Sequence, residues 1–251
     1  LTEFGLSEPA LYRRDVPVML GRLMQLPDWV DRRDLKVAPF APGRPEALVK
    51  QPDIFKAIQK GDVLLHHPYQ SFSPVLEFIK RAATDPDVVA IKQTIYRTGT
   101  ESVLMDSLLA AARSGKEVTV VLELMARFDE EANINWASKL ERVGAHVVYG
   151  VVGQKTHAKM VMVVRREKTE TGKVILRRYV HMGTGNYHPK TARLYTDCGL
   201  FSCDESLGHE VHEVFNHLIV LGRAHKLERI WNSSFNLHST VIIEDREKPE
   251  L

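Results

Sequence analysis

Apolar runs and helical patterns alternate through the middle of the chain, and this alternation limits the folds open to it. Runs rich in Val and Ile begin at Val88, Val118 and Val147. The segments between them, residues 101–114 and 132–143, carry apolar residues at helical spacing. Short β-branched runs predict buried strands. Strands that alternate with helices indicate an α/β sheet with helices packed on its faces.

A further apolar run, Val161–Val164, directly follows a short motif, His157-Ala158-Lys159-Met160. Side chains on a strand alternate between its two faces, so His157 and Lys159 should share one face at the start of this strand. The polar stretch Lys168–Gly172 predicts a turn, and Val174–Met182 is the expected hairpin partner. Weaker signals predict helices at 51–60, 72–84 and 205–221 and strands at 63–65 and 194–203.

Composition excludes several classes of protein. The net charge of +2 gives no general attraction to nucleic acid or to an anionic membrane. No apolar run approaches the roughly 18 residues that a membrane span needs, and no signal peptide is visible. Cys198 and Cys203 have no second cysteine pair, which argues against a zinc site and indicates a reducing compartment. We therefore expect a cytoplasmic protein that binds no nucleic acid.

Three groups suited to phosphate chemistry lie next to apolar runs. Arg97 and Arg127 follow two predicted strands, and His157 opens a third. Sites in α/β sheets form at strand ends, so these groups are expected to converge. A guanidinium fits phosphate oxygens in pairs, and an imidazole beside Lys159 can attack phosphorus while the cation offsets oxygen charge. Taken singly, a surface position explains each of them better, but together they predict a phosphate site.

A loop with small side chains, Gly183-Thr184-Gly185-Asn186, follows the predicted hairpin. Its backbone N–H groups can approach a phosphate closely. A dinucleotide fingerprint would need a third glycine where His188 stands, so that reading fails. Asn186 is expected either to hydrogen-bond His157 or a substrate oxygen, or simply to fill the turn, as Asn often does.

Two other histidine motifs fit a site less well. In His188-Pro189-Lys190 the central proline disfavours a position within a strand, so a loop or a helix start is expected there. His209 and His212 are three residues apart rather than four, so the zinc-protease pattern is absent. Both are predicted to be helix-surface residues.

Together these segments resemble polyphosphate kinase of the first type, a family whose catalytic core is similar to phospholipase D. The resemblance covers roughly residues 10–245. It rests on Ile91–Arg97, Ala126–Glu130, Thr156–Met160 and His181–Asp197. It implies an α/β fold in which a phospholipase D-like mixed sheet has helices on both faces. It also implies reversible transfer of the ATP γ-phosphate to inorganic polyphosphate through a phosphohistidine.

The resemblance implies a role for each matching residue. His157 resembles the phosphorylated histidine, and Lys159 the lysine of the same motif. Arg97 and Arg127 match residues assigned to the magnesium site. Because a guanidinium cannot ligate a metal, we expect both to contact phosphate oxygens that also hold Mg²⁺. Tyr195 matches a residue that contacts the nucleotide.

The small-residue loop is similar to the Gly-x-x-Asn part of the phospholipase D signature, which implies phosphate contacts for Gly185 and Asn186. That signature has an Asp five residues after its Lys, where this chain has Val164. The kinase family shares this departure, which argues against lipid hydrolysis.

The resemblance further implies a longer polypeptide. Residues 1–48 are similar to the end of a preceding domain and its linker, 49–222 to the catalytic domain, and 223–251 to a connector to a second half that supplies another histidine and arginine. The expected partners are ATP, ADP and inorganic polyphosphate, with a homo-oligomer at full length and peripheral membrane association left open. The chain alone is expected to be weak or inactive.

Two alternatives remain open at this point. One is a phosphodiesterase of the phospholipase D class with a similar histidine nucleophile. The other is a non-catalytic module that binds polyphosphate and never becomes phosphorylated.

Overall fold

The chain forms two units, residues 1–41 and 42–251, in a computed structural model. The structure describes residues 2–5, 7–10, 12–15, 19–38, 40–97, 102–123, 130–150, 156–220, 227–231 and 237.

The first unit consists of short helical turns whose described side chains are exposed. Its elements are η1 (Thr2–Phe4), η2 (Glu8–Ala10), η3 (Leu20–Gln25), α1 (Leu26–Trp29) and η4 (Arg33–Leu35). Among its described residues α1 is the only α-helix, and it is a single turn. Met24 and Trp29 leave 81% and 76% of their surfaces exposed, so this unit buries no core of its own among its described residues.

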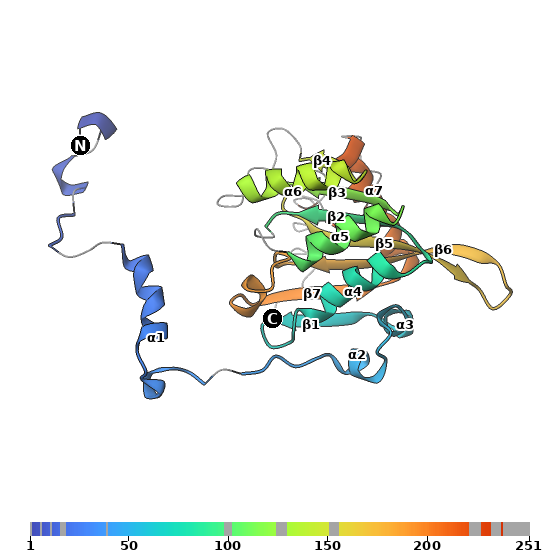
Figure 1. Ribbon diagram of the computed structural model, residues 1–251, viewed down its shortest axis with the longest axis horizontal. Coiled ribbons are helices and arrows are strands. Elements are labelled where there is room, and N and C mark those ends of the chain that lie inside the picture. The colour runs from blue at the N-terminus through green and yellow to red at the C-terminus, as the bar shows by residue number, and fades with distance from the viewer. Residues whose placement is uncertain are drawn as a thin grey trace, which may run out of the picture. The chain divides into compact units, whose positions relative to one another are not determined.

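The second unit is built on a seven-stranded mixed sheet in the order β1-β7-β6-β5-β2-β3-β4 (Figure 1). The strands are β1 (Val63–His67), β2 (Val88–Ile95), β3 (Glu117–Leu122), β4 (His146–Tyr149), β5 (Lys159–Lys168), β6 (Val174–Gly183) and β7 (Asp197–Ser202). β2, β3 and β4 run parallel, whereas β5 pairs antiparallel with both β2 and β6. The two remaining pairs, β6 with β7 and β7 with β1, are also antiparallel.

Helices cover both faces of this sheet, as predicted. On one face the core includes residues of α3 (Ile54–Lys60), α4 (Ser73–Thr84), α5 (Val103–Arg113) and α6 (Glu130–Arg142). On the other face α7 (Glu205–Val220) packs against β3, β5 and β6. The short helix α2 (Glu46–Lys50) places Leu48 in the first of these cores. The predicted fold class, a mixed α/β sheet with helices on both faces, is confirmed. None of the described helices is both long and apolar enough to cross a membrane.

The strand directions bring distant parts of the chain to one edge of the sheet. β2 and β3 end at this edge, and so does β6, because β5 lies antiparallel between β2 and β6. β5 and β7 begin there. Arg97, His157 and the loop after Gly183 therefore lie at the same end of the sheet. Gly183 follows Arg97 by 86 positions in the sequence.

At this edge of the sheet, two predicted strand starts were wrong by a few residues. β5 begins at Lys159, so His157 lies two residues before the strand rather than in it. β7 begins at Asp197 and not at Leu194, because a 3₁₀ turn, η5 (Thr191–Arg193), comes first. The N–H groups of Leu194 and Tyr195 both donate to Thr191 O and prolong that turn.

Candidate active site

His157 is an exposed residue in the short segment that leads into β5. The segment is fixed from β2: Thr94 Oγ1 donates to Ala158 O at 2.7 Å and accepts from Met160 N at 2.9 Å. Thr94 is buried, so these two bonds are shielded from water. The backbone on the C-terminal side of His157 is thus anchored while its imidazole faces solvent.

Tyr96 lies at the centre of the predicted site. Its ring centroid lies 5.2 Å from that of His157, with the two rings nearly perpendicular at 80°. Arg97 Cζ lies 5.6 Å from the Tyr96 ring centroid and Lys159 Nζ lies 5.2 Å from it. Both cations are within the range of a cation–π contact. One aromatic ring therefore brings the imidazole, the guanidinium and the ammonium together.

Lys159 is 6% exposed, and its Nζ donates to His157 O at 2.7 Å. A buried ammonium is costly unless polar groups or charges compensate it. An anion that reaches His157 would meet this cation with little competition from water. The ammonium of Lys159 is therefore held against the His157 backbone, while the predicted pairing of the two side chains at a phosphate stays a prediction.

A buried carboxylate and a buried amide connect the ends of the strands. Glu123 follows β3, and its Oε2 accepts a hydrogen bond from Thr156 N at 2.8 Å. Asn133 on α6 donates from Nδ2 to Tyr96 O at 3.1 Å and to Glu123 O at 3.0 Å. Glu123 is 4% exposed and Asn133 is fully buried. Neither residue was predicted as part of the site, because nothing in the local pattern marks them.

The loop after β6 is held by Asp197. Thr184 Oγ1 donates to Asp197 Oδ1 at 2.8 Å and accepts from Cys198 N at 3.0 Å. A Cβ atom on Gly185 would lie 2.5 Å from Asp197 Oδ2, so only glycine fits this close approach. Asn186 is half-buried, and its Oδ1 has no hydrogen-bond partner among the described residues. The loop is thus a shaped backbone surface at the same edge as His157.

A neutral histidine lies beneath this edge. His181 on β6 is 2% exposed, and a 2.8 Å hydrogen bond joins its Nδ1 to Tyr187 Oη. Burial, and then the positive charge of His67 when protonated, lower the pKa of His181 to about 3. His181 is therefore uncharged at neutral pH and supports the site through packing rather than through charge.

Of the remaining predicted residues, the structure describes Tyr195, His188 and Lys190 but not Arg127. Tyr195 follows η5 and is 61% exposed, so its ring is accessible to a ligand. Arg127 falls within residues 124–129, which lie outside the described residues. His188 and Lys190 flank a turn just before η5, as predicted for that motif.

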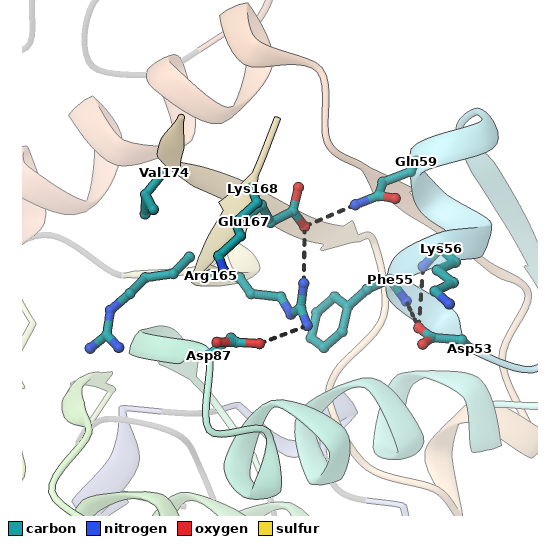
Figure 2. Close-up of a pocket in the computed structure, with 10 residues that line it drawn as sticks. Asp53, Phe55, Lys56, Gln59, Asp87, Arg165, Glu167, Lys168 and Val174 are labelled. Carbon is teal, nitrogen blue, oxygen red and sulfur yellow. Dashed lines mark hydrogen bonds and ion pairs between the residues drawn. The ribbon is translucent and has the colours of Figure 1, made fainter. Parts of the chain in front are cut away.

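The cavity drawn in Figure 2 lies at the opposite end of the sheet, and several of its charged groups form ion pairs. It measures about 490 Å³ and is lined by α3 and the outer parts of β5 and β6. Arg165 donates to Asp85, Asp87 and Glu167, and Gln59 donates to Glu167. Burial alone would raise the pKa of Glu167, but hydrogen bonds from Tyr179 and the arginines lower it instead. We interpret this cluster as structural.

The histidines and cysteines outside the site form no metal centre in the described part of the chain. His209 is exposed on α7, whereas His212 is half-buried there rather than on the surface as predicted. Cys198 and Cys203 are both free thiols.

The polyphosphate kinase C-terminal domain 1 family matches residues 53–224 of the chain. The polyphosphate kinase of Burkholderia ambifaria is 62% identical over 242 residues, which are 96% of this chain and 35% of that protein. The polyphosphate kinase of Paraburkholderia phytofirmans is 59% identical over 250 residues, or 36% of its length. The chain thus spans about a third of the length of these relatives.

The crystal structure of polyphosphate kinase from Porphyromonas gingivalis matches with a TM-score of 0.78 at 30% identity. The match covers 93% of this chain and 38% of that one. The sequence and structure comparisons agree on the family. This chain belongs to the polyphosphate kinase family and contains its C-terminal domain 1.

Proposed function

We propose that this chain is the part of a polyphosphate kinase that becomes phosphorylated, and that His157 is the nucleophile. The observation that supports this most is the contact of exposed His157 with the Tyr96 ring, which Arg97 and Lys159 also approach. A nucleophile that faces solvent beside two fixed cations suits attack on a phosphoryl group. The names of the relatives point to polyphosphate, and the resemblance to the family implies ATP as the phosphoryl donor.

The proposed reaction has two reversible steps. An unprotonated imidazole nitrogen of His157 attacks the γ-phosphorus of ATP. An N–P bond forms while the bond from that phosphorus to the β–γ bridging oxygen breaks, and ADP leaves with the electron pair. A terminal oxygen of polyphosphate then attacks the same phosphorus, the N–P bond breaks, and the imidazole returns to its neutral form.

The cations act on the charge of the moving phosphoryl group. Lys159 and Arg97 lie beside Tyr96, and Arg127 is assigned the same role by its motif. Fixed positive groups are most effective where water is excluded, and Lys159 is almost fully buried. Losing one such fixed group costs about 10²–10³ in rate in well-studied enzymes.

The nucleotide and the phosphate chain would use the neighbouring loop. The exposed Tyr195 ring is suited to contact with an adenine base. The backbone N–H of Gly185 and the side chain of Asn186 are suited to phosphate oxygens. Asp197 packs so closely against Gly185 that a side chain there would displace it, so glycine preserves the shape of this loop.

Magnesium enters this proposal as part of the nucleotide substrate. The described residues contain no group of three or more His, Cys, Asp or Glu side chains that could hold a metal ion. Arginine carries only donors and cannot ligate a cation. Arg97 and Arg127 would therefore contact the phosphate oxygens that also carry Mg²⁺.

The relatives are about three times as long as this chain. The complete polyphosphate kinase activity would therefore need parts of the protein beyond these 251 residues. We propose that residues 49–222 act as the catalytic domain between 1–48 and a connector, 223–251. The remaining part would supply a second histidine and arginine and the homo-oligomeric contacts. By itself the chain is then expected to be weak or inactive.

The test is label transfer from γ-³²P-ATP with Mg²⁺. It uses this chain and a chimera in which the chain replaces the matching 242 residues of the Burkholderia ambifaria relative. We expect acid-labile, alkali-stable label on the chimera and its loss in His157→Ala. His188→Ala is the matched control, because it removes the other His-x-Lys histidine, and it should keep the label.

Three results would contradict the proposal. Label that persists in His157→Ala would mean that another residue is the nucleophile. Phosphodiester cleavage without any label transfer would favour a phospholipase D-type enzyme. Binding of polyphosphate that is unchanged in His157→Ala, with no label on the wild type, would favour a binding module.

A further inference from the structure

We propose that Tyr96 is a positioning residue for His157, and that its ring, rather than its hydroxyl group, sets the direction of the imidazole. This inference rests on the proposed function of His157. The ring also places the two neighbouring cations, so one side chain determines the relative positions of three functional groups.

The ring contact restricts the imidazole. The two rings meet at 80° with centroids 5.2 Å apart, an edge-to-face arrangement. Aromatic rings favour this geometry because the positive edge of one meets the negative face of the other. His157 is exposed on the side that a ligand would approach, and the Tyr96 ring packs against its imidazole. The Tyr96 contact therefore limits the directions in which the reactive nitrogen can point.

The same ring attracts the cations. Arg97 Cζ and Lys159 Nζ lie 5.6 Å and 5.2 Å from its centroid. Such contacts arise from the ring quadrupole and need no hydroxyl group. Replacing the tyrosine by phenylalanine should therefore leave the arrangement intact, whereas an aliphatic side chain should release it.

The backbone of Tyr96 is fixed as firmly as its ring. Asn133 bonds Tyr96 O and Glu123 O with one amide group, and Glu123 Oε2 accepts from Thr156 N. Thr156 directly precedes His157. The contacts form a closed chain: Tyr96 O, Asn133, Glu123, Thr156, and then the His157 imidazole, which packs on the Tyr96 ring. The backbone next to each ring is therefore held by hydrogen bonds.

This rigidity matters for the chemical step. In-line attack requires the imidazole nitrogen to face the phosphorus at near-contact distance. A misplacement of about 1 Å can cost roughly a hundredfold in rate. The role of Tyr96 should therefore appear in the rate of phosphorylation at saturating ATP.

The experiment compares Tyr96→Phe with Tyr96→Leu in the chimera, by single-turnover labelling of His157 at saturating γ-³²P-ATP. Tyr96→Met serves as a second aliphatic variant, with an unbranched side chain of about the same volume as Leu, and thermal unfolding checks that each variant is folded. We expect Tyr96→Phe to stay within about threefold of wild type. The two aliphatic variants should lose roughly a hundredfold without a matching loss of stability.

A second measurement does not depend on activity. The imidazole C–H signals of His157, identified by their loss in His157→Ala, are followed by NMR in the same variants of the chain. Loss of the Tyr96 ring current should shift these signals in Tyr96→Leu but hardly in Tyr96→Phe.

Wild-type rates or unshifted signals in the aliphatic variants would overturn the proposal. A Tyr96→Phe variant as slow as Tyr96→Leu would also overturn it, because the hydroxyl group would then carry the effect. If even the wild type acquires no label, the proposed function fails, and the NMR signals alone decide the role of Tyr96.

Discussion

His181 is expected to make the folded chain less stable as the pH falls from 7 to 5. It is 2% exposed, and its pKa is lowered from 6.5 to about 3 by burial and by His67. In the unfolded chain the same imidazole is in water and takes up a proton near its ordinary pKa. Between these two values the unfolded state binds more protons than the folded state, so protons favour unfolding.

The size of the effect follows from the two pKa values. Each pH unit below the unfolded value of 6.5 costs about 1.4 kcal/mol until the folded value of about 3 is reached. The loss from this one side chain should be close to zero at pH 7, about 0.8 kcal/mol at pH 6 and about 2 kcal/mol at pH 5. A typical domain has only about 5–15 kcal/mol of stability, so the change is measurable.

The assay is urea unfolding of the chain at pH 7, 6 and 5, for the wild type and for His181→Gln. The variant removes the titrating ring but keeps a side chain that can hydrogen-bond Tyr187. Its unfolding free energy should fall by about 2 kcal/mol less between pH 7 and pH 5 than that of the wild type. His209→Gln, which changes an exposed histidine on α7, should keep the wild-type dependence.

Equal pH dependence in His181→Gln and the wild type would refute the reasoning. It would mean that His181 titrates near its ordinary pKa in the folded chain. The burial and packing described here would then not exclude water from that ring.

Three further changes test other parts of the structure by urea unfolding. Asp53→Ala removes the cap that accepts from two N–H groups at the start of α3 and should cost about 1 kcal/mol; an unchanged midpoint would mean that the cap contributes nothing. Gly185→Ala forces a Cβ to within 2.5 Å of Asp197 Oδ2 and should lower the unfolding free energy by about 1–3 kcal/mol. An unchanged unfolding free energy would mean that the loop shifts without cost. Ile91→Ala opens a cavity at a fully buried position and should cost about 2–5 kcal/mol, against about 1 kcal/mol for Ile91→Val; equal costs would contradict tight packing there.

The elements in the middle of the chain could be predicted because local pattern decides them. The apolar spacing of α5 stops just before Gly115, whose φ of +83° suits the turn that ends the helix. The hairpin of β5 and β6 follows from two apolar runs and the polar turn between them, and the register confirms their pairing. In each case the signal lies within a few residues of the structure that it predicts.

β7 shows where local pattern was insufficient. The apolar and aromatic residues from Leu194 onward read as a strand, but the hydrogen bonds to Thr191 O keep the first of them in a turn. Thr184 then holds Asp197 and the N–H of Cys198, which sets the start of the strand. Thr184 and Asp197 are 13 residues apart, on either side of a loop. The residues of β7 by themselves therefore give no sign of this contact.

The site was partly predictable for the same reason. Motifs picked out His157, Lys159 and Arg97 as candidates, and the structure brings all three to one ring. The motifs gave no role to Tyr96, although it directly precedes Arg97 in the segment Ile91–Arg97. The carboxylate of Glu123 acts on a backbone 33 residues away, which only the folded chain brings close.

The long hairpin at the centre of the sheet suggests a way to divide the protein. Paired residues run without interruption from Lys159–Gly183 to Lys168–Val174, so this hairpin extends about 30 Å from the edge that carries His157. A cut at its turn, near Gly172, would leave His157 on one fragment and the Gly185 loop on the other. Pairing of β5 with β6 would then be needed to reassemble the candidate site, and the proposed phosphorylation of His157 would report that two separate polypeptides had associated.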